Sequence, residues 1–122
     1  MVLDTNFLLL PLQFGVNIFK QVEELMEAPH EFVVPSGVVG ELKVIARGRG
    51  RDGSAARFAL KLLDSIKARH VPSTGNVDDW IVEYAAKEGA VVATNDMLLR
   101  NRLKKAGVKM IALRSRARLG VV

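Results

Sequence analysis

The sequence predicts an α/β fold, a three-layer sandwich in which a mostly parallel central sheet is flanked by helices. Short apolar segments alternate with longer segments whose apolar residues have helical spacing. Of the 122 residues, 49% are hydrophobic and 25% are charged, which suits one compact domain. Alternating strands and helices favour a parallel sheet with right-handed crossovers. We therefore expect a single domain over residues 1–122, with a basic C-terminal tail from about residue 114.

The expected strands are short and apolar, and each expected helix has one apolar face. The strands are 2–4, 32–34, 90–94 and 109–113, and the helices are 17–26, 36–46, about 54–68, 78–87 and 97–105. The first of these helices has the apolar face Ile18, Val22, Leu25 and Met26. Ser36 is expected to cap the second.

Glycines delimit the later helices. The glycine-rich segment 48–53 precedes the helix 54–68, whose expected apolar stripe is Phe58, Leu62, Leu63 and Ile66. Gly89 and Gly107 follow the last two helices, at positions where helix C-termini are expected. The strand 90–94 between them is expected to be buried.

Composition excludes several kinds of site. The chain has no cysteine, so it forms neither disulfides nor thiolate metal sites, and His30 and His70 are too few for a typical zinc centre. Any metal must therefore be held by oxygen. No apolar run is long enough for a membrane span, and the strand-like start at Met1 leaves no room for a signal peptide. We expect a cytoplasmic protein.

The net charge of +5 is unevenly distributed. Lys20 is the only basic residue among the first forty, whereas residues 43–69 carry eight basic side chains and two acidic ones. Every charged residue after Asp96 is basic. Such zones are typical of surfaces that contact a phosphate backbone, although a solvated surface without a partner is the alternative.

Two acids directly follow expected strands. Asp4 follows Val2 and Leu3, and Asp96 comes after the strand 90–94. In open parallel sheets ligands bind beyond the carboxyl ends of the strands, so these two acids are expected to be neighbours if their strands are adjacent. The alternative for each is to cap the helix that follows it.

Two further acids lie on expected helices. Glu41 comes three residues after Val38, on the shoulder of the inward face of its helix, where a carboxylate is costly unless it is paired or bound to metal. Asp78 is in line with Ile81 on the apolar stripe of its helix, whereas Asp79 points about a quarter turn away. An error of one residue in helix phase would exchange Asp78 and Asp79. Oxygen donors of this kind select Mg²⁺ or Mn²⁺.

Four segments resemble the successive motifs of PIN-domain ribonucleases. They are VLDTNFLL, VPSGVVGELK, DDWIVEYA and VVATND, and the resemblance runs from Met1 to about Leu113. IFKQVEELME, EFVVPSGVVGELK and ARGRGRDG are similar to the branch containing the rRNA-processing nucleases of small-subunit assembly and their compact prokaryotic relatives. VapC-type toxin nucleases are similar mainly at the acids.

The resemblance implies a PIN-like endoribonuclease that hydrolyses RNA with Mg²⁺ or Mn²⁺ and leaves 5′-phosphate and 3′-hydroxyl ends. It makes Asp4, Glu41, Asp78 and Asp96 the metal-binding catalytic acids, with Asp79 the alternative third ligand. The polar groups expected to orient carboxylates or a bound water are Thr5, Asn6, Thr94 and Asn95. Turn and capping chemistry is the alternative for Thr5 and Asn95.

The same resemblance implies RNA as substrate, a homodimer, and either rRNA processing with a ribosome-assembly partner or a toxin role with an antitoxin. The glycine-rich segment is expected to be a flexible cationic loop, and the candidate RNA-binding residues are Lys43, Arg47, Arg49, Arg51 and Arg57. A surface loop without function is the alternative.

Other functional classes fit less well. A haloacid-dehalogenase-like phosphatase needs an aspartate where Asn6 stands, and a receiver domain needs one where Pro35 and Ser36 follow the second strand. A structure-specific DNA nuclease is the closer rival, but no insertion is large enough for a helical arch. A non-catalytic RNA-binding or assembly module stays open, because acids in place do not establish turnover.

Overall fold

The computed structural model describes residues 1–14, 17–25, 31–115 and 118–122, and it has the predicted α/β fold. Its six strands form one sheet in the order β3-β2-β1-β4-β5-β6, parallel except for β6, which pairs antiparallel with β5. The strands are β1 (Val2–Leu3), β2 (Val33–Pro35), β3 (Arg69–Val71), β4 (Val92–Ala93), β5 (Met110–Ser115) and β6 (Arg118–Val121). The helices are α1 (Thr5–Phe14), α2 (Ile18–Leu25), α3 (Ser36–Ala46), α4 (Gly50–Ser65), α5 (Val77–Glu88) and α6 (Met97–Lys105).

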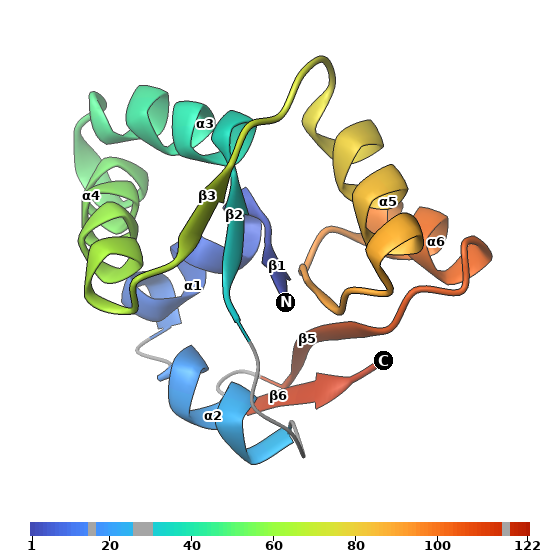
Figure 1. Ribbon diagram of the computed structural model, residues 1–122. Coiled ribbons are helices and arrows are strands. Elements are labelled where there is room, and N and C mark those ends of the chain that lie inside the picture. The colour runs from blue at the N-terminus through green and yellow to red at the C-terminus, as the bar shows by residue number, and fades with distance from the viewer. Residues whose placement is uncertain (15–16, 26–30, 116–117) are drawn as a thin grey trace.

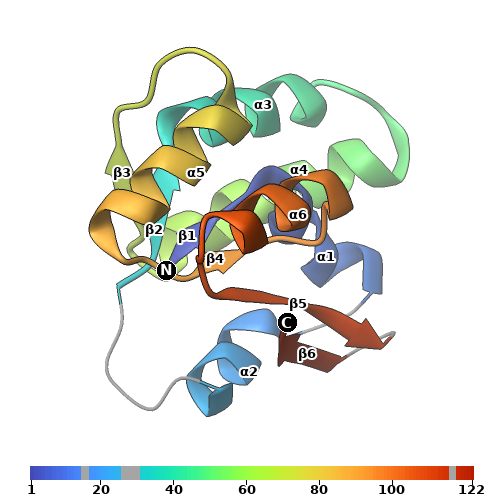
Figure 2. The same cartoon turned by 90° about the vertical axis from the view of Figure 1, so that its right-hand side faces the viewer.

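The helices cover both faces of the sheet. Helices α1, α3 and α4 lie together on one side, and α5 and α6 lie on the other (Figures 1 and 2). Helix α2 packs beside β6. The two layers bury one continuous apolar core around the central strand, with Leu3, Leu42 and Ile81 each fully enclosed. This arrangement confirms the expected three-layer sandwich. No helix among the described residues is both long and apolar enough to cross a bilayer.

Helix α1 and strand β3 were absent from the sequence prediction. Helix α1 has Pro11 inside it, and its residues Phe7 to Leu10 are all buried, so it lacks the polar face that helical periodicity reveals. Strand β3 has the opposite character, since Arg69 and His70 are exposed at the edge of the sheet. Neither segment therefore has the apolar pattern by which the other elements were recognised.

Helix α4 begins earlier than predicted and packs through a different stripe. It starts at Gly50, and its buried side chains include Ala55, Ala59 and Leu63, whereas Phe58 is 39% exposed. A Cβ atom at Gly53 would lie 2.1 Å from the carbonyl oxygen of Gly48, so only glycine lets the chain turn this tightly into α4. The expected flexible loop is therefore reduced to residues 47–49.

The start of α3 and the C-terminal segment also differ from the prediction. Pro35, not Ser36, is the N-cap residue of α3, and it supplies no side-chain acceptor. The basic segment expected as a tail contains the end of β5 and all of β6, which begins at Arg118. In the first expected helix, Met26 lies outside the described residues.

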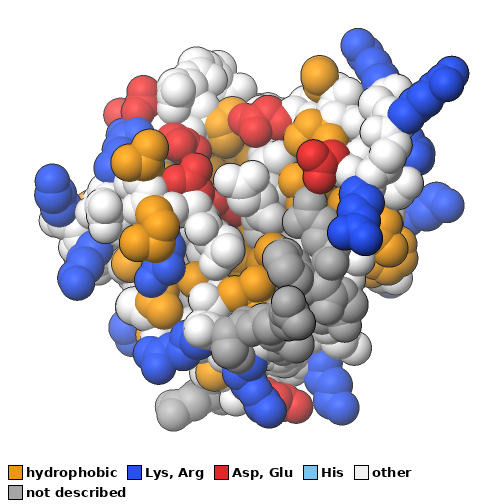
Figure 3. All heavy atoms as spheres, turned by 180° about the vertical axis from the view of Figure 1, so that it is seen from behind, with side chains coloured by type: hydrophobic (Ala, Val, Ile, Leu, Met, Phe, Trp, Pro, Cys, Tyr) orange, Lys and Arg blue, Asp and Glu red, His pale blue; other side chains and the backbone are white. Residues whose placement is uncertain are grey.

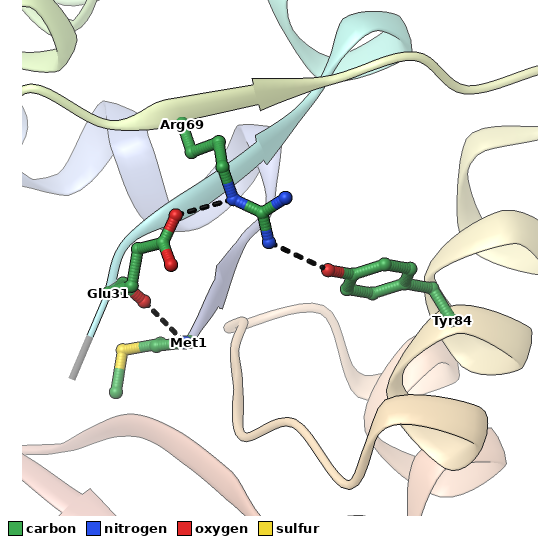
Figure 4. A network of polar contacts seen from close by, with 4 residues as sticks. All are labelled: Met1, Glu31, Arg69 and Tyr84. Atoms are coloured by element: carbon green, nitrogen blue, oxygen red, sulfur yellow. Dashed lines mark hydrogen bonds and ion pairs between the residues drawn. The ribbon is translucent and has the colours of Figure 1, made fainter.

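A polar network joins the N-terminal ends of β1, β2 and β3 (Figure 4). The amino group of Met1 donates to the carbonyl oxygen of Glu31 at 2.7 Å, and the Glu31 carboxylate pairs with Arg69. The Arg69 guanidinium also donates to the Tyr84 hydroxyl at 3.4 Å, which joins β3 to α5. The ring of Tyr84 stacks on that of Trp80, with centroids 4.7 Å apart. These contacts fix α5 against the sheet at the end opposite to the acids described next.

Candidate active site

The predicted acids meet in one pocket beyond the carboxyl ends of β1 and β4. The cavity has a volume of about 210 Å³ and is lined by Asp4, Thr5, Asn6, Glu41, Asn76, Val77, Asp78 and Asp96. In Figure 3 acidic side chains gather in the upper part of the face, and lysine and arginine side chains stand around its margins. The parallel pairing of β1 with β4 explains why residues more than ninety positions apart share this pocket.

Asp4 lies at the base of the pocket and is only 5% exposed. Its Oδ1 accepts a hydrogen bond from the backbone N–H of Phe7 at 2.7 Å, so Asp4 caps α1. Its Oδ2 accepts a hydrogen bond from the hydroxyl of Thr94. Asp4 thus caps a helix and also faces the pocket, so the capping alternative does not exclude the functional one.

Thr94 connects the two acids that follow strands. It is fully buried, and its hydroxyl oxygen donates to Asp4 and accepts from the backbone N–H of Asp96 at 3.1 Å. Asp96 in turn caps α6, since its Oδ1 accepts from the backbone N–H groups of Leu98 at 2.9 Å and Leu99 at 3.2 Å. Both of these bonds end on one oxygen, and no described residue bonds to the second oxygen of Asp96, a residue that lines the pocket.

Glu41 reaches the pocket from α3 and is held by Thr5, whose hydroxyl donates to Oε2 of Glu41 at 3.0 Å. Glu41 is exposed, so the expectation that its carboxylate is costly to bury is wrong. The reason is that α3 buries the narrow stripe of Val38 and Leu42 and leaves the neighbouring face at the pocket mouth. Glu41 therefore needs no metal to offset burial, and it is a candidate ligand because it lines the pocket.

Asp78 and Asp79 point in different directions at the start of α5. Asp78 lines the pocket, whereas the side chain of Asp79 is 60% exposed and pairs with Arg102 of α6 at 2.7 Å. The side chain of Asn76 caps the helix by accepting from the backbone N–H of Asp79 at 3.0 Å. The helix therefore has the phase that the sequence favoured, with Asp78 facing the pocket and Asp79 facing away from it.

The predicted orienting groups separate into two kinds. Thr5 and Thr94 bond to pocket carboxylates, and Asn6 lines the pocket. Asn95 does not line it, because its Oδ1 accepts from the backbone N–H of Leu113 at 3.3 Å and so fixes the start of α6 to β5. Asn95 therefore stabilises the turn before α6 and does not orient a pocket carboxylate, which is the alternative role considered for it.

Sequence reasoning missed two pocket residues, Asn76 and Val77. A signal for Asn76 was present, since an asparagine three residues before Asp79 at a helix start is a common N-cap arrangement. Val77 carried no such signal, because a single valine before two acids looks like any other apolar residue.

Burial and mutual repulsion shape the electrostatics of the pocket. Burial raises the pKa of Asp4 from 3.8 to about 7, against the hydrogen bonds from Thr94 and Phe7, and the charges of Asp78 and Asp96 raise it further. The pKa of Asp78 is also raised, first by burial and then by Asp96, while Arg102 opposes the shift. The N-termini of α1, α5 and α6 all lie at the pocket, and their helix dipoles offset part of this negative charge.

The raised pKa of Asp4 predicts that the metal-free protein loses stability as the pH rises. Folding favours the protonated carboxyl, so the penalty is absent below the unfolded value near 3.8 and complete above about 7. In chelator, Asp4→Asn should be more stable than the wild type at pH 8 by on the order of a few kcal/mol, and equally stable at about pH 3, below the unfolded pKa. Urea unfolding across this range measures the difference. A constant difference at all pH values would contradict the assignment.

The pocket suits a divalent cation by its chemistry. Among the described residues, no three acidic or histidine side chains converge closely enough on one point to hold an ion. The wall nevertheless offers carboxylate, hydroxyl and amide oxygens and no nitrogen or sulfur ligand, which is the donor set of Mg²⁺ and Mn²⁺. Two of these carboxylates are also held within the protein, Asp96 by backbone N–H groups at the start of α6 and Glu41 by the Thr5 hydroxyl.

The basic residues predicted to bind RNA lie along the end of α3 and the start of α4. Lys43, Arg47, Arg49 and Arg51 are exposed there. The Arg57 guanidinium instead holds the connection between the two helices, because it donates to the carbonyl oxygens of Ala46 at 2.7 Å and Gly48 at 3.1 Å.

Comparisons with known proteins agree with this fold. The family described as PIN like domain matches residues 1–116. Ribonuclease VapC9 of Archaeoglobus fulgidus is 31% identical over 98% of this chain and 87% of its own length. Ribonuclease VapC4 of Methanocaldococcus jannaschii is 29% identical over 93% of this chain and 88% of its own length. The VapC likeness therefore extends far beyond the acids.

A solved structure shares the whole architecture. The PIN domain endonuclease Utp24 superposes with a TM-score of 0.80 and is 25% identical, and the alignment covers 98% of this chain and 88% of that one. The family match, the two relatives and the structural likeness agree. The chain belongs to the PIN-like domain family.

Proposed function

We propose that this protein is a divalent-metal-dependent endoribonuclease. The observation that carries the proposal is the pocket in which Asp4, Glu41, Asp78 and Asp96 line one cavity at the carboxyl edge of the sheet. The names of the VapC ribonucleases and of the Utp24 endonuclease support a nuclease activity. The polar lining of the pocket alone would also suit a phosphatase. The likeness to the VapC ribonucleases is what favours RNA as the substrate.

Each pocket residue has a distinct role in this proposal. Asp4 and Asp96 would hold Mg²⁺ or Mn²⁺ from the strand ends, and Glu41 and Asp78 would hold it from the two flanking helices. When bound, the cation supplies Lewis acidity that acidifies a water molecule and offsets negative charge on the scissile phosphate. Thr94 and Thr5 fix the directions of Asp4 and Glu41 through the hydrogen bonds described above.

Metal dependence and product ends test the proposal directly. RNA is expected to be cut with Mn²⁺ or Mg²⁺ and not in EDTA, leaving 5′-phosphate and 3′-hydroxyl ends. End-labelled RNA, resolved by electrophoresis before and after phosphatase treatment, distinguishes these ends. Cleavage in EDTA that leaves 2′,3′-cyclic phosphates would refute the proposal, since it indicates attack by the RNA's own 2′-hydroxyl without a metal-activated water.

An acidic pocket repels a polyanion, so RNA must be held by basic residues outside it. We propose that Lys43, Arg47, Arg49 and Arg51 form this surface, which runs from the last turn of α3, the helix that carries Glu41, to the first turn of α4. Arg57 is left out, because its guanidinium is already used within the protein. Such contacts to phosphates position RNA and carry little sequence information.

Replacing Arg47, Arg49 and Arg51 together with alanine should weaken RNA binding in EDTA and flatten its dependence on salt. Each lost phosphate contact to a single strand removes about 0.7 from the slope of log K against log salt. A matched control replaces Lys20, Lys87 and Lys109, which are exposed elsewhere and remove the same charge. Fluorescence anisotropy at several salt concentrations measures both variants. Equal slopes for the two would show that net charge alone attracts RNA.

The relatives favour a toxin role as the biological setting. The two VapC ribonucleases match nearly the whole chain, so a VapC-type toxin with a cognate antitoxin is the first candidate. A role in rRNA processing, implied by the resemblance to the small-subunit branch, is the second candidate. A small antitoxin gene beside this one would favour the first.

A further inference from the structure

The loop that precedes α5 is fastened to the first turn of α3. This loop, residues 72–76, passes from β3 by the start of α3 on its way to α5 (Figure 1). Ser73 accepts a hydrogen bond from the backbone N–H of Gly37 at 2.8 Å, and its own backbone N–H donates to the Ser36 hydroxyl at 2.8 Å. The two serine hydroxyls also lie 3.2 Å apart. We call these contacts of Ser73 with Ser36 and Gly37 the Ser36–Ser73 clasp.

The clasp supplies the cap that α3 lacks. The first N–H groups of a helix have no partner within it, and a side chain at the N-cap position normally accepts from one of them. Pro35 occupies that position in α3 and has no acceptor. Ser73, thirty-six residues away, accepts from Gly37 in its place. The start of α3 and the loop before α5 therefore stabilise each other.

Gly37 allows the loop to come this close. A Cβ atom on Gly37 would lie 2.7 Å from Cγ2 of Val77 and 3.1 Å from the Ser73 hydroxyl oxygen. Val77 is the first residue of α5 and lines the acidic pocket, and Asp78 follows it directly. A side chain at position 37 would therefore require Val77, at the start of α5, to shift away from α3.

The face of α3 that receives the loop is the face that carries Glu41. Residues four apart in a helix lie one above the other, so Gly37 and Glu41 share this face. Glu41 enters the pocket from α3 and Asp78 enters it from α5. We propose that the Ser36–Ser73 clasp, with Gly37 as its contact point, sets the separation of Glu41 and Asp78, which makes Ser73 and Gly37 positioning residues for cation binding. The proposal rests on the proposed function.

Metal affinity gives the first test. Ser73→Ala removes the acceptor, and Gly37→Ala inserts a methyl group between α3 and Val77; both should weaken Mn²⁺ binding by roughly tenfold, as is typical when a group that orients metal ligands is lost. Gly40→Ala is the matched control, because it makes the same change in the same helix where no atom lies within 4 Å of the added Cβ. Its Mn²⁺ affinity should stay within about twofold of the wild type. Titration calorimetry measures all four proteins.

A second measurement does not depend on metal or catalysis. The chain has no cysteine, so Lys43→Cys on α3 and Glu83→Cys on α5, both exposed positions, can carry spin labels. Electron spin resonance in EDTA then reports the distance between the two helices. We expect Gly37→Ala and Ser73→Ala to lengthen or broaden the distance distribution, and Gly40→Ala to leave it unchanged.

The two measurements separate the possible failures. Unchanged distances in Gly37→Ala and Ser73→Ala would overturn the clasp proposal, whether or not the protein binds Mn²⁺. Changed distances with wild-type Mn²⁺ affinity would also overturn it, because the clasp would then serve folding alone. Changed distances in a protein whose wild type binds no Mn²⁺ would overturn the proposed function and leave the clasp as the element that spaces α3 and α5.

Discussion

Asp4→Asn is expected to lower kcat/KM for RNA cleavage by roughly a hundredfold or more while the protein stays folded. Even groups that only orient a metal ligand change affinity or activity by about 10–100-fold when lost, and a direct ligand at the base of the pocket should matter at least as much. Asparagine keeps an oxygen for the Phe7 N–H and can donate its amide to Thr94, so the geometry of the cap is preserved. What it removes is the charge.

Single-turnover cleavage of a structured RNA with Mn²⁺ measures this effect, and far-ultraviolet circular dichroism verifies the fold. Asp64→Asn is the matched control, because Asp64 is exposed on α4 and does not line the pocket. Its cleavage rate should equal that of the wild type. If Asp4→Asn cleaved RNA as fast as Asp64→Asn, the acidic pocket could not be the active site.

Asp78→Asn and Asp79→Asn form the second pair with a large expected difference. These neighbours have the same chemistry and differ only in direction, since Asp78 lines the pocket and Asp79 pairs with Arg102 at the surface. Asp78→Asn should therefore lower kcat/KM by roughly a hundredfold. Asp79→Asn should lower it no more than a fewfold, because an exposed ion pair contributes only about 0–1 kcal/mol.

The Mn²⁺ affinities of the two variants should differ in the same order as their kcat/KM values. Such a result would show that the loss of activity arises from weaker metal binding. Titration calorimetry of the two variants is expected to show weak binding for Asp78→Asn and near wild-type binding for Asp79→Asn. The reverse order would mean that α5 is rotated by about one residue when the cation binds. Equal losses would mean that Arg102 and Asp79 are needed to hold the start of α5 in place.

The inner strands β2, β1, β4 and β5 and most of the pocket could be predicted because their signals are local. Strand ends followed by Asp4 and Asp96 indicate one edge of a parallel sheet, and the helical phase at Ile81 places Asp78 inward. The partner of Asp79 could not be predicted, since Arg102 approaches it from α6 only once α5 and α6 pack together.

The remaining differences arise where tertiary contacts override local patterns. Helix α1 is enclosed on nearly all sides and has no amphipathic pattern, and α4 begins early because Gly53 fits against the Gly48 carbonyl. The missing cap of α3 is supplied by Ser73, which no local rule could identify as a partner of Gly37. Exposure of Glu41 depends on which stripe α3 buries, and its neighbours α1 and α4 decide that.

The strand order determines how late in its synthesis the protein can complete its acidic pocket. β1 is made first, yet its two partners in the sheet begin at residues 33 and 92, and Thr94 and Asp96 are synthesised some ninety residues after Asp4. At roughly 5–20 residues per second, this gap corresponds to several seconds of translation. The acidic pocket therefore cannot be complete until Asp96 has been synthesised, when most of the chain has already been made.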